Sequence, residues 1–174
     1  GAVLEALNDE WLDAFFLEEL VEFRPAQRQL LDALYRSDGP AFVGMPHGSG
    51  RTVATELFVL RQLKLILDPV DGDEISATAE PRTIVYLHPD RKVCARRAAA
   101  WAKKLAALAD FVPVAGDGAV ALVQLEDPSV ASGVDENLVR LRRAAKKQPN
   151  AKARIVLATP TAWREIAWRA KEQA

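Results

Sequence analysis

The segment Gly44-Met45-Pro46-His47-Gly48-Ser49-Gly50-Arg51-Thr52 is the most informative stretch of this 174-residue chain. It follows a short apolar, β-prone run at 41–44 and precedes a helical pattern from Thr52 to about Leu67. Glycines at 48 and 50 allow a tight turn that directs backbone N–H groups at an anion, and the helix dipole adds positive potential. The order strand, glycine-rich loop, helix therefore predicts a phosphate-binding loop.

The polar positions of this loop have expected roles toward a nucleotide. We expect the backbone of Gly48, Ser49 and Gly50 to surround the phosphates. Arg51 is placed to meet the β and γ phosphates, and the hydroxyl of Thr52 to bind a Mg²⁺ ion that bridges them. The alternative is a glycine-rich turn between strand and helix that binds no ligand.

Two residues depart from the pattern G-x-x-x-x-G-K-[S/T]. Met45 stands where a small residue is usual, and Arg51 replaces the lysine. Arginine carries a planar fork that is bulkier and differently hydrated than the compact lysine ammonium, so this exchange is not conservative at a tight phosphate site. We expect a site that binds nucleotide weakly and hydrolyses it poorly or not at all.

The rest of the chain alternates β-prone and helical patterns. Four short apolar runs bounded by turn residues are interpreted as buried parallel strands, at 41–44, 83–87, 111–114 and 154–158. Residues 119–125 are a candidate for a further short strand, and helical spacing runs from Cys94 to Leu108 and from Val134 to Ala145. This alternation predicts an α/β fold with a parallel sheet covered by helices on both faces.

Helix-start signals support these boundaries. Ser132 and Asp135 have capping-box spacing, and Thr159 is a cap residue followed by Pro160 at the first helical position. Trp101, Trp163 and Trp168 lie on apolar helix faces and are expected in the core. Cys94 is expected to be a small buried hydrophobic residue and His88 a surface loop residue.

Composition excludes several classes of protein. With 49% hydrophobic residues the chain can bury a core, and 23 Lys plus Arg against 24 Asp plus Glu exclude a polycation. A single cysteine allows no internal disulfide and no four-cysteine zinc site, and no apolar run has membrane-spanning length. We expect a soluble, intracellular protein with no membrane contact.

Charge is unevenly distributed. Seven acids and no base precede Phe23, which indicates an acidic helical N-terminal segment at 1–22 before a larger domain at 23–174. From Leu138 to Arg164 the acids disappear and bases accumulate, namely Arg140, Arg142, Arg143, Lys146, Lys147, Lys152, Arg154 and Arg164. Both runs are interpreted as solvated helix faces, with contact to an acidic partner protein as the alternative for the basic run.

Several segments resemble motifs of superfamily 2 RNA helicases. Residues 23–27 (FRPAQ) resemble the F-x-P-x-Q motif that reads adenine, and 43–60 look like V-G-A-P-T-G-S-G-K-T and the helix after it. Residues 84–95 resemble the strand and P-x-x-A-L-A segment that grips the RNA backbone, 115–117 sit where a T-G-E turn is expected, and 155–163 look like I-I-I-S-T-P-E-K-W. The tryptophan after T-P points to the Ski-two-like group of large DExH-box helicases.

The resemblance implies a partial RecA-like P-loop NTPase domain, the N-terminal one of a helicase cassette, with ATP and Mg²⁺ as cofactors. It implies that Phe23 and Gln27 lie near adenine. It also implies contacts to the RNA backbone at Pro89, Asp90, Arg91, Gly116, Thr159 and Pro160. Within the group it points to the second, less active of two tandem cassettes in a nuclear protein of the splicing machinery, whose partners are RNA and other splicing proteins in a large ribonucleoprotein assembly.

The acidic D-E-x-H motif of that family is expected on a strand beyond Ala174, so the chain would hold about three quarters of one ATP-binding domain. Two alternatives stay open. One is an inactive pseudo-helicase cassette that serves as a scaffold for proteins, which Met45 and Arg51 favour. The other is a small-molecule P-loop kinase, which would need an arginine-rich lid and a substrate aspartate that the sequence does not offer.

Overall fold

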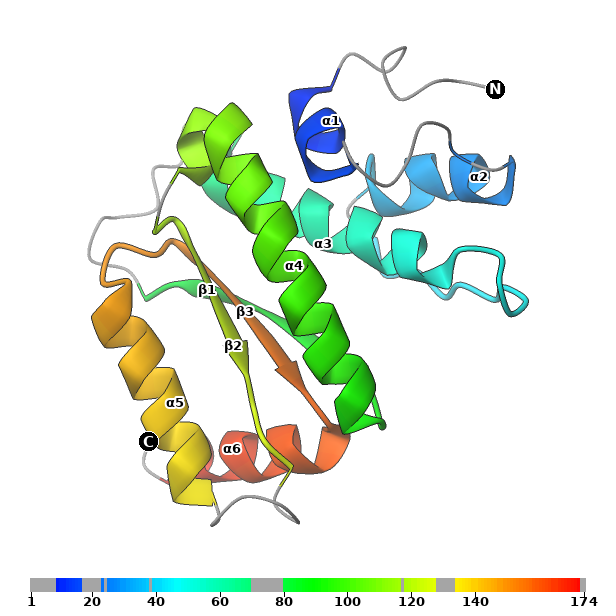
Figure 1. The fold of residues 1–174 in the computed structure, drawn as a ribbon. Helices are drawn as coiled ribbons and strands as arrows, with labels where there is room; N and C mark the ends of the chain where they lie inside the picture. Colours follow the sequence, from blue (N-terminus) through cyan, green and yellow to red (C-terminus); the bar gives the residue numbers. More distant parts are fainter. Residues whose placement is uncertain are drawn as a thin grey trace.

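The computed structural model describes residues 9–16, 23, 25–37, 39–69, 80–116, 118–127 and 134–172, the side chains of 134, 135 and 169–172 excepted. Helices and strands alternate along most of this part (Figure 1). The helices are α1 (Glu10–Phe16), α2 (Pro25–Leu34), α3 (Arg51–Leu67), α4 (Arg91–Phe111), the short 3-10 helix η2 (Pro113–Ala115), α5 (Val134–Lys147) and α6 (Pro160–Glu172). The strands are β1 (Arg82–Leu87), β2 (Val120–Gln124) and β3 (Ala153–Ala158).

The three strands form a parallel sheet in the order β1-β3-β2. Ile155 at the centre of β3 lies opposite Ile84 of β1 and Leu122 of β2. The strands predicted at 83–87, 119–125 and 154–158 are thereby confirmed. Apart from Arg154, strand β3 is apolar, as expected for the central strand of a parallel sheet whose two faces are both covered.

Helices cover both faces of the sheet, as predicted (Figure 1). Ile155 and Leu157 share one buried cluster with α3 and α4. Val156 and Ala158 share another with residues of α5 and α6. The alternation of side chains along a strand sends neighbouring residues of β3 into these two separate cores.

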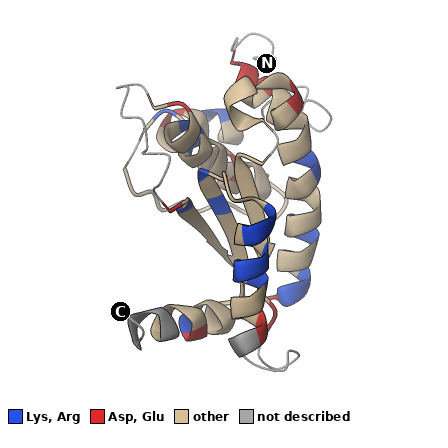
Figure 2. Cartoon of the chain, turned by 90° about the vertical axis from the view of Figure 1, so that its left-hand side faces the viewer, with Lys and Arg blue, Asp and Glu red and all other residues tan. Residues whose placement is uncertain are grey.

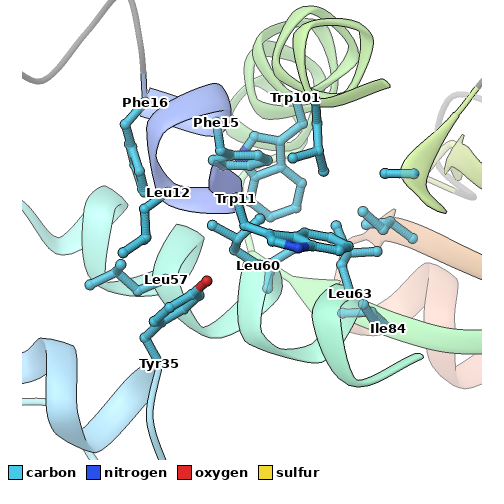
Figure 3. Close-up of a cluster of buried hydrophobic side chains, with 14 of the residues drawn as sticks. Trp11, Leu12, Phe15, Phe16, Tyr35, Leu57, Leu60, Leu63, Ile84 and Trp101 are labelled. Carbon is cyan, nitrogen blue, oxygen red and sulfur yellow. The ribbon is translucent and has the colours of Figure 1, made fainter. Parts of the chain in front are cut away.

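Helix α1 packs into the larger of the two cores. Figure 3 shows Trp11 and Phe15 lying against Leu60 and Leu63 of α3 and against Trp101 of α4. Trp11 is 1% exposed even though it lies within the acidic N-terminal run. The acidic side chains of this run therefore coexist with a buried apolar face of α1, and the boundary at residues 22 and 23 stays a prediction.

The strand predicted at 41–44 does not form. Residues 40–46 have no regular secondary structure, and Phe42 is fully exposed. A β-prone run becomes a strand only where a neighbouring strand takes up its backbone hydrogen bonds, and no described strand lies beside this one. The glycine-rich loop thus precedes α3 as predicted, but it follows an irregular segment.

The strand predicted at 111–114 is also wrong. Phe111 ends α4, and Pro113 starts the 3-10 helix η2. Proline cannot donate to a sheet ladder, whereas its fixed φ suits the first position of a helical turn. The strand of this region begins at Val120 instead.

The predicted helices are confirmed, and all but one of the tryptophans expected in the core are at least partly buried. Cys94, Trp101 and Leu108 lie on the buried face of α4. Trp163 is half-buried against the smaller core, but Trp168 is 67% exposed, so its predicted core position is wrong. Ser132 lies outside the described residues.

Candidate nucleotide-binding loop and its surroundings

The loop before α3 depends on glycine at two positions. Gly48 has φ +77° and Gly50 has φ +95°, in the left-handed region that strains other residues. The turn is closed by Ser49, whose N–H and hydroxyl both donate to the carbonyl of Pro46, at 3.4 and 2.6 Å. Gly48 is exposed and Gly50 half-exposed, so the backbone at the start of α3 is accessible to an anion.

Gln27 lies directly against this loop. Its side chain is on the buried face of α2 and 4% exposed. A Cβ atom at Gly50 would overlap with the Gln27 amide, so a larger residue there would have to displace this side chain in addition to adopting a left-handed φ. The structure therefore brings together two of the segments that the sequence singles out. Phe23 is instead 1% exposed, with its ring 5.9 Å from Phe16, and is not exposed to a ligand.

Arg51 and Thr52 begin α3, and both are exposed. The Thr52 hydroxyl accepts a hydrogen bond from the Arg97 guanidinium at 2.9 Å, which places a positive charge next to the oxygen expected to bind Mg²⁺. The described residues contain no cluster of three or more acidic, histidine or cysteine side chains able to hold a metal. The loop thus fits a phosphate group, and a Mg²⁺ ion at Thr52 would lie beside the Arg97 guanidinium.

Met45 does not project into solvent. It is half-buried and packs against the larger hydrophobic core. The bulky residue at this position therefore anchors the loop to the domain.

A buried carboxylate lies one turn beyond Thr52. Glu56 accepts from the Trp101 indole N–H at 3.0 Å and from the Lys104 ammonium at 3.0 Å, and Arg97 lies 3.5 Å away. Both members of the Glu56–Lys104 pair are nearly inaccessible, with side-chain exposures of 2% and 7%. A buried pair of this kind is destabilising to break, because the remaining charge would lose a close opposite charge in a poorly hydrated site.

The Lys104 ammonium is also covered by aromatic rings. Its Nζ lies 5.1 Å from the ring centre of Phe15 and 4.7 Å from that of Phe16, within cation–π range. Glu56 therefore connects α3 to α4, and Lys104 extends the connection to α1. The sequence contained a usable signal, since Glu56 is a lone charge between apolar residues at 53–60 and Arg97, Trp101 and Lys104 share one helix face.

Two of the loops expected to contact RNA lie together. The His88 N–H after β1 donates to the carbonyl of Ala158 at the end of β3, at 3.1 Å. This places Pro89, Asp90 and Arg91 at the same carboxyl edge of the sheet as Thr159 and Pro160. Ligands of open parallel sheets bind at this edge.

The exposure of these residues differs. Pro89, Asp90, Arg91 and Pro160 are exposed, and the Asp90 carboxylate caps α4 by accepting from the Lys92 N–H at 2.8 Å. Thr159 is buried, and its hydroxyl caps α6 at the Ala162 N–H.

Gly116 is not part of this group. It follows η2 and precedes β2, whose N-terminal end is marked by the bond from the Lys152 N–H to the Ala119 carbonyl. Because the strand expected before Gly116 is absent, the residue lies at the amino edge of the sheet. The carboxyl end of β2 instead brings Asp127 to Thr159, whose hydroxyl lies 3.2 Å from the carboxylate. The sequence analysis missed Asp127.

Two further groups have a structural role. Cys94 is 1% exposed, which confirms its predicted burial, its thiol donates to the His88 carbonyl at 3.6 Å, and burial raises its pKa. The Tyr35 hydroxyl donates to Asp9 at 3.0 Å, and burial together with this carboxylate raises the pKa of Tyr35 well above its usual value. Asp9 also pairs with Lys64, so it links α1, α2 and α3.

Comparison with curated proteins finds similarity to large helicases over parts of the chain. The human "U5 small nuclear ribonucleoprotein 200 kDa helicase" is 35% identical over 60 residues, 34% of this chain. The "RQC trigger complex helicase SLH1" of Saccharomyces cerevisiae is 32% identical over 108 residues, 61% of this chain. The "DExH-box ATP-dependent RNA helicase DExH14" of Arabidopsis thaliana is 31% identical over 91 residues, 52% of this chain. No protein-family model matches.

These matches support a segment of a Ski-two-like DExH helicase. They cover only 3–4% of the length of those relatives. The similarity to helicases suggests a RecA-like fold, and the observed α/β architecture with its parallel sheet agrees with this. None of the described helices combines the length and apolar character needed to cross a membrane.

Proposed function

We propose that the chain is part of the nucleotide-binding RecA-like domain of an ATP-dependent RNA helicase that works in the nuclear splicing machinery, with a degenerate phosphate loop. The observation that carries this proposal is the packing of Gln27 against Gly50. It joins the segment that resembles an adenine-reading motif to the segment that resembles a phosphate loop. The names of several relatives support the assignment to splicing, although SLH1 is named for a different complex.

Binding would use the backbone of the loop and the start of α3. The N–H groups at the helix N-terminus attract the phosphates, and the exposed Arg51 adds a positive charge. Gln27 lies next to this loop, and its role toward the base is assigned by resemblance. Asp90 and Arg91 at the carboxyl edge would meet RNA, a role assigned by resemblance.

Hydrolysis is poorly supported by the same residues. Phosphoryl transfer to water needs a metal ion on the phosphates and a group that orients the water. The Thr52 hydroxyl is bonded to Arg97, and the Glu56 carboxylate is buried among Arg97, Trp101 and Lys104. The chain is therefore proposed to bind nucleotide weakly, with little dependence on Mg²⁺.

A pseudo-helicase scaffold is the second candidate. The Arg97–Thr52 hydrogen bond favours it, because it closes the metal position with a side chain of the protein itself. The kinase alternative gains no support, since the curated relatives named above are helicases.

The test is a titration of the chain with a fluorescent ATP analogue, with and without Mg²⁺. We expect weak saturable binding that Gly50→Ala abolishes, because the new methyl group meets both a left-handed φ and Gln27. Gly44→Ala is the matched control, because no atom lies within 4 Å of its Cβ position. Absence of binding at nucleotide concentrations on the order of 1 mM would contradict the nucleotide-binding proposal and favour the pseudo-helicase scaffold. Tight Mg²⁺-dependent binding with RNA-stimulated turnover would exclude the scaffold.

A further inference from the structure

Strand β2 has a side that no described strand covers. It pairs with β3 alone among the described residues. The Ala119 carbonyl accepts a hydrogen bond from the Ala153 N–H, and the Leu125 N–H donates to the Leu157 carbonyl. The odd-numbered residues of this segment therefore direct their backbone N–H and C=O groups toward β3. The N–H and C=O groups of Val120, Leu122 and Gln124 therefore point to the outer side. Such an edge is a template for a further strand.

Two neighbouring hollows flank this edge. One, of about 400 Å³, lies between β2 and α5 and is lined among others by Gln124, Val139 and Arg143. The other, of about 370 Å³, lies between β2, α4 and the end of α5, and its α4 wall is formed by small and apolar residues, Ala102, Leu105, Ala106, Leu108 and Ala109. Leu122, Ala144 and Lys147 line both. We call the two hollows together the β2 groove.

One wall of the β2 groove is basic. Figure 2 shows Lys and Arg residues along α5, and Arg143 and Lys147, one turn apart, both line the groove and are exposed. Neither forms an ion pair with another described residue. Arg140 differs, because it pairs with Glu126 and Glu136 at 3.2 Å and its charge is compensated. The positive potential of the groove therefore comes from Arg143 and Lys147.

We propose that the β2 groove binds an extended acidic segment of a partner protein, which adds to β2 as a further strand. Side chains of an extended segment alternate between two sides. One set would place carboxylates at Arg143 and Lys147, and the other would place small aliphatic groups against Ala102, Leu105 and Ala109 of α4. The outward N–H and C=O groups of β2 supply the main-chain hydrogen bonds, as in other cases of strand addition.

A peptide fits these features better than RNA. Among the described residues no aromatic side chain lines either hollow, so this part of the groove offers no stacking platform of the kind typical of single-stranded nucleic-acid sites. Its walls include Leu105, Leu122 and Val139, which suit aliphatic side chains. The groove also runs along the β2 edge, away from Pro89 and Arg91 after β1, and the proposal does not depend on nucleotide binding.

The experiment measures binding of a fluorescein-labelled peptide of ten alternating Glu and Val residues to the chain by fluorescence anisotropy. We expect binding that weakens with rising salt and is reduced about 10-fold or more by the double variant Arg143→Glu/Lys147→Glu. Arg142→Glu/Lys146→Glu is the matched control, since it makes the same charge change on exposed residues of α5 that do not line the groove. The control should change the affinity by less than about 3-fold.

A backbone variant tests strand addition itself. Gln124→Pro removes an N–H that points away from β3 and leaves the β2–β3 hydrogen bonds in place, a position where an edge strand tolerates proline. We expect about 10-fold weaker peptide binding with unchanged circular dichroism and thermal midpoint. A peptide of the same composition with its glutamates in one block should bind weakly to the unmodified chain.

Three results would overturn the proposal. The first is equal weakening by the two double variants, which would indicate unspecific attraction to a basic helix. The second is unchanged binding in folded Gln124→Pro. The third is tighter binding of an oligouridine of ten phosphates than of the peptide, with the same sensitivity to Arg143→Glu/Lys147→Glu, which would make the groove a nucleic-acid site.

Discussion

The two faces of the sheet are built differently. The face covered by α3 and α4 has a large core that includes the fully buried rings of Trp11, Phe16 and Trp101, and the charges of Glu56 and Lys104 lie inside it. The face covered by α5 and α6 has a smaller core, and none of its buried residues that the structure describes is aromatic. Arg142, Arg143, Lys146 and Lys147 of α5 are exposed to solvent, whereas Arg154 of β3 and Glu165 of α6 are half-buried.

Because of this difference, one part of the molecule contributes most to the stability of the fold and another offers an accessible surface for binding. Apolar burial stabilises a fold roughly in proportion to the area removed from water, so the aromatic face contributes more to folding. The glycine-rich loop is attached to that face through α3. The β2 groove lies open along the edge of the sheet, lined by α4 on one side and α5 on the other. Changes near the loop should therefore affect folding and binding together, whereas changes in the groove should affect binding alone.

The largest expected effect is that of Glu56→Ala. The change leaves the Lys104 ammonium buried without its carboxylate, and the Trp101 indole N–H without an acceptor. We expect a loss of about 3–5 kcal/mol in the free energy of unfolding, measured by urea denaturation. The double variant Glu56→Leu/Lys104→Met should recover most of this loss, because it removes both charges. A loss below about 1 kcal/mol for Glu56→Ala would contradict a buried ion pair on this face.

A matched pair of truncations compares the two cores directly. Leu60 is fully buried beneath α1, and Ile166 of α6 is 6% exposed in the smaller core. Both truncations should lower the free energy of unfolding by about 2–5 kcal/mol. The loss for Leu60→Ala should lie in the upper part of this range and that for Ile166→Ala in the lower part, because the structure around a site near the surface relaxes more easily. Both are measured by the same urea titration. Equal losses would remove the distinction between the faces.

The smallest expected effect concerns the attachment of α1. Because the pKa of Tyr35 is raised in the folded state above its unfolded value of about 10, folding is favoured below that pH. Stability should fall as the pH rises above about 10, where the unfolded phenol ionises and the folded one does not.

Tyr35→Phe should cost about 1 kcal/mol at neutral pH through the lost bond to Asp9, and should flatten the alkaline decline. Thermal unfolding between pH 7 and 11 measures both effects. Tyr86→Phe, at the other tyrosine of the chain, controls for loss of a hydroxyl. An unchanged alkaline decline in Tyr35→Phe would assign it to another group.

Local patterns predicted most of the elements correctly. The spacing of Cys94, Trp101 and Leu108 identified the buried face of α4, and Thr159-Pro160 marked the start of α6. These signals depend on residues that are close in the sequence, so they can be recognised without knowledge of the tertiary structure. The errors at 41–44 and 111–114 arose where the outcome depended on a pairing partner, or on the missing N–H of Pro113.

The site was predicted only in part for a similar reason. Gly48 and Gly50 were identifiable, because a left-handed turn selects glycine wherever it occurs. The contacts of Glu56 with Lys104 and of Thr159 with Asp127 join distant segments, and no spacing rule specifies them. The position of Gly116 was misjudged because the strand beside it follows rather than precedes it.

The amino-acid order alone was enough to establish an α/β chain with a glycine-dependent loop at the start of a helix, because backbone preference and periodicity act over a few residues. Folding in three dimensions was needed to place Gln27 on that loop, to put Arg97 on the hydroxyl expected to hold a metal, and to leave the outer side of β2 beside a basic helix. These features arise from contacts between segments far apart in the chain, where packing and hydrogen-bond pairing select among many local possibilities.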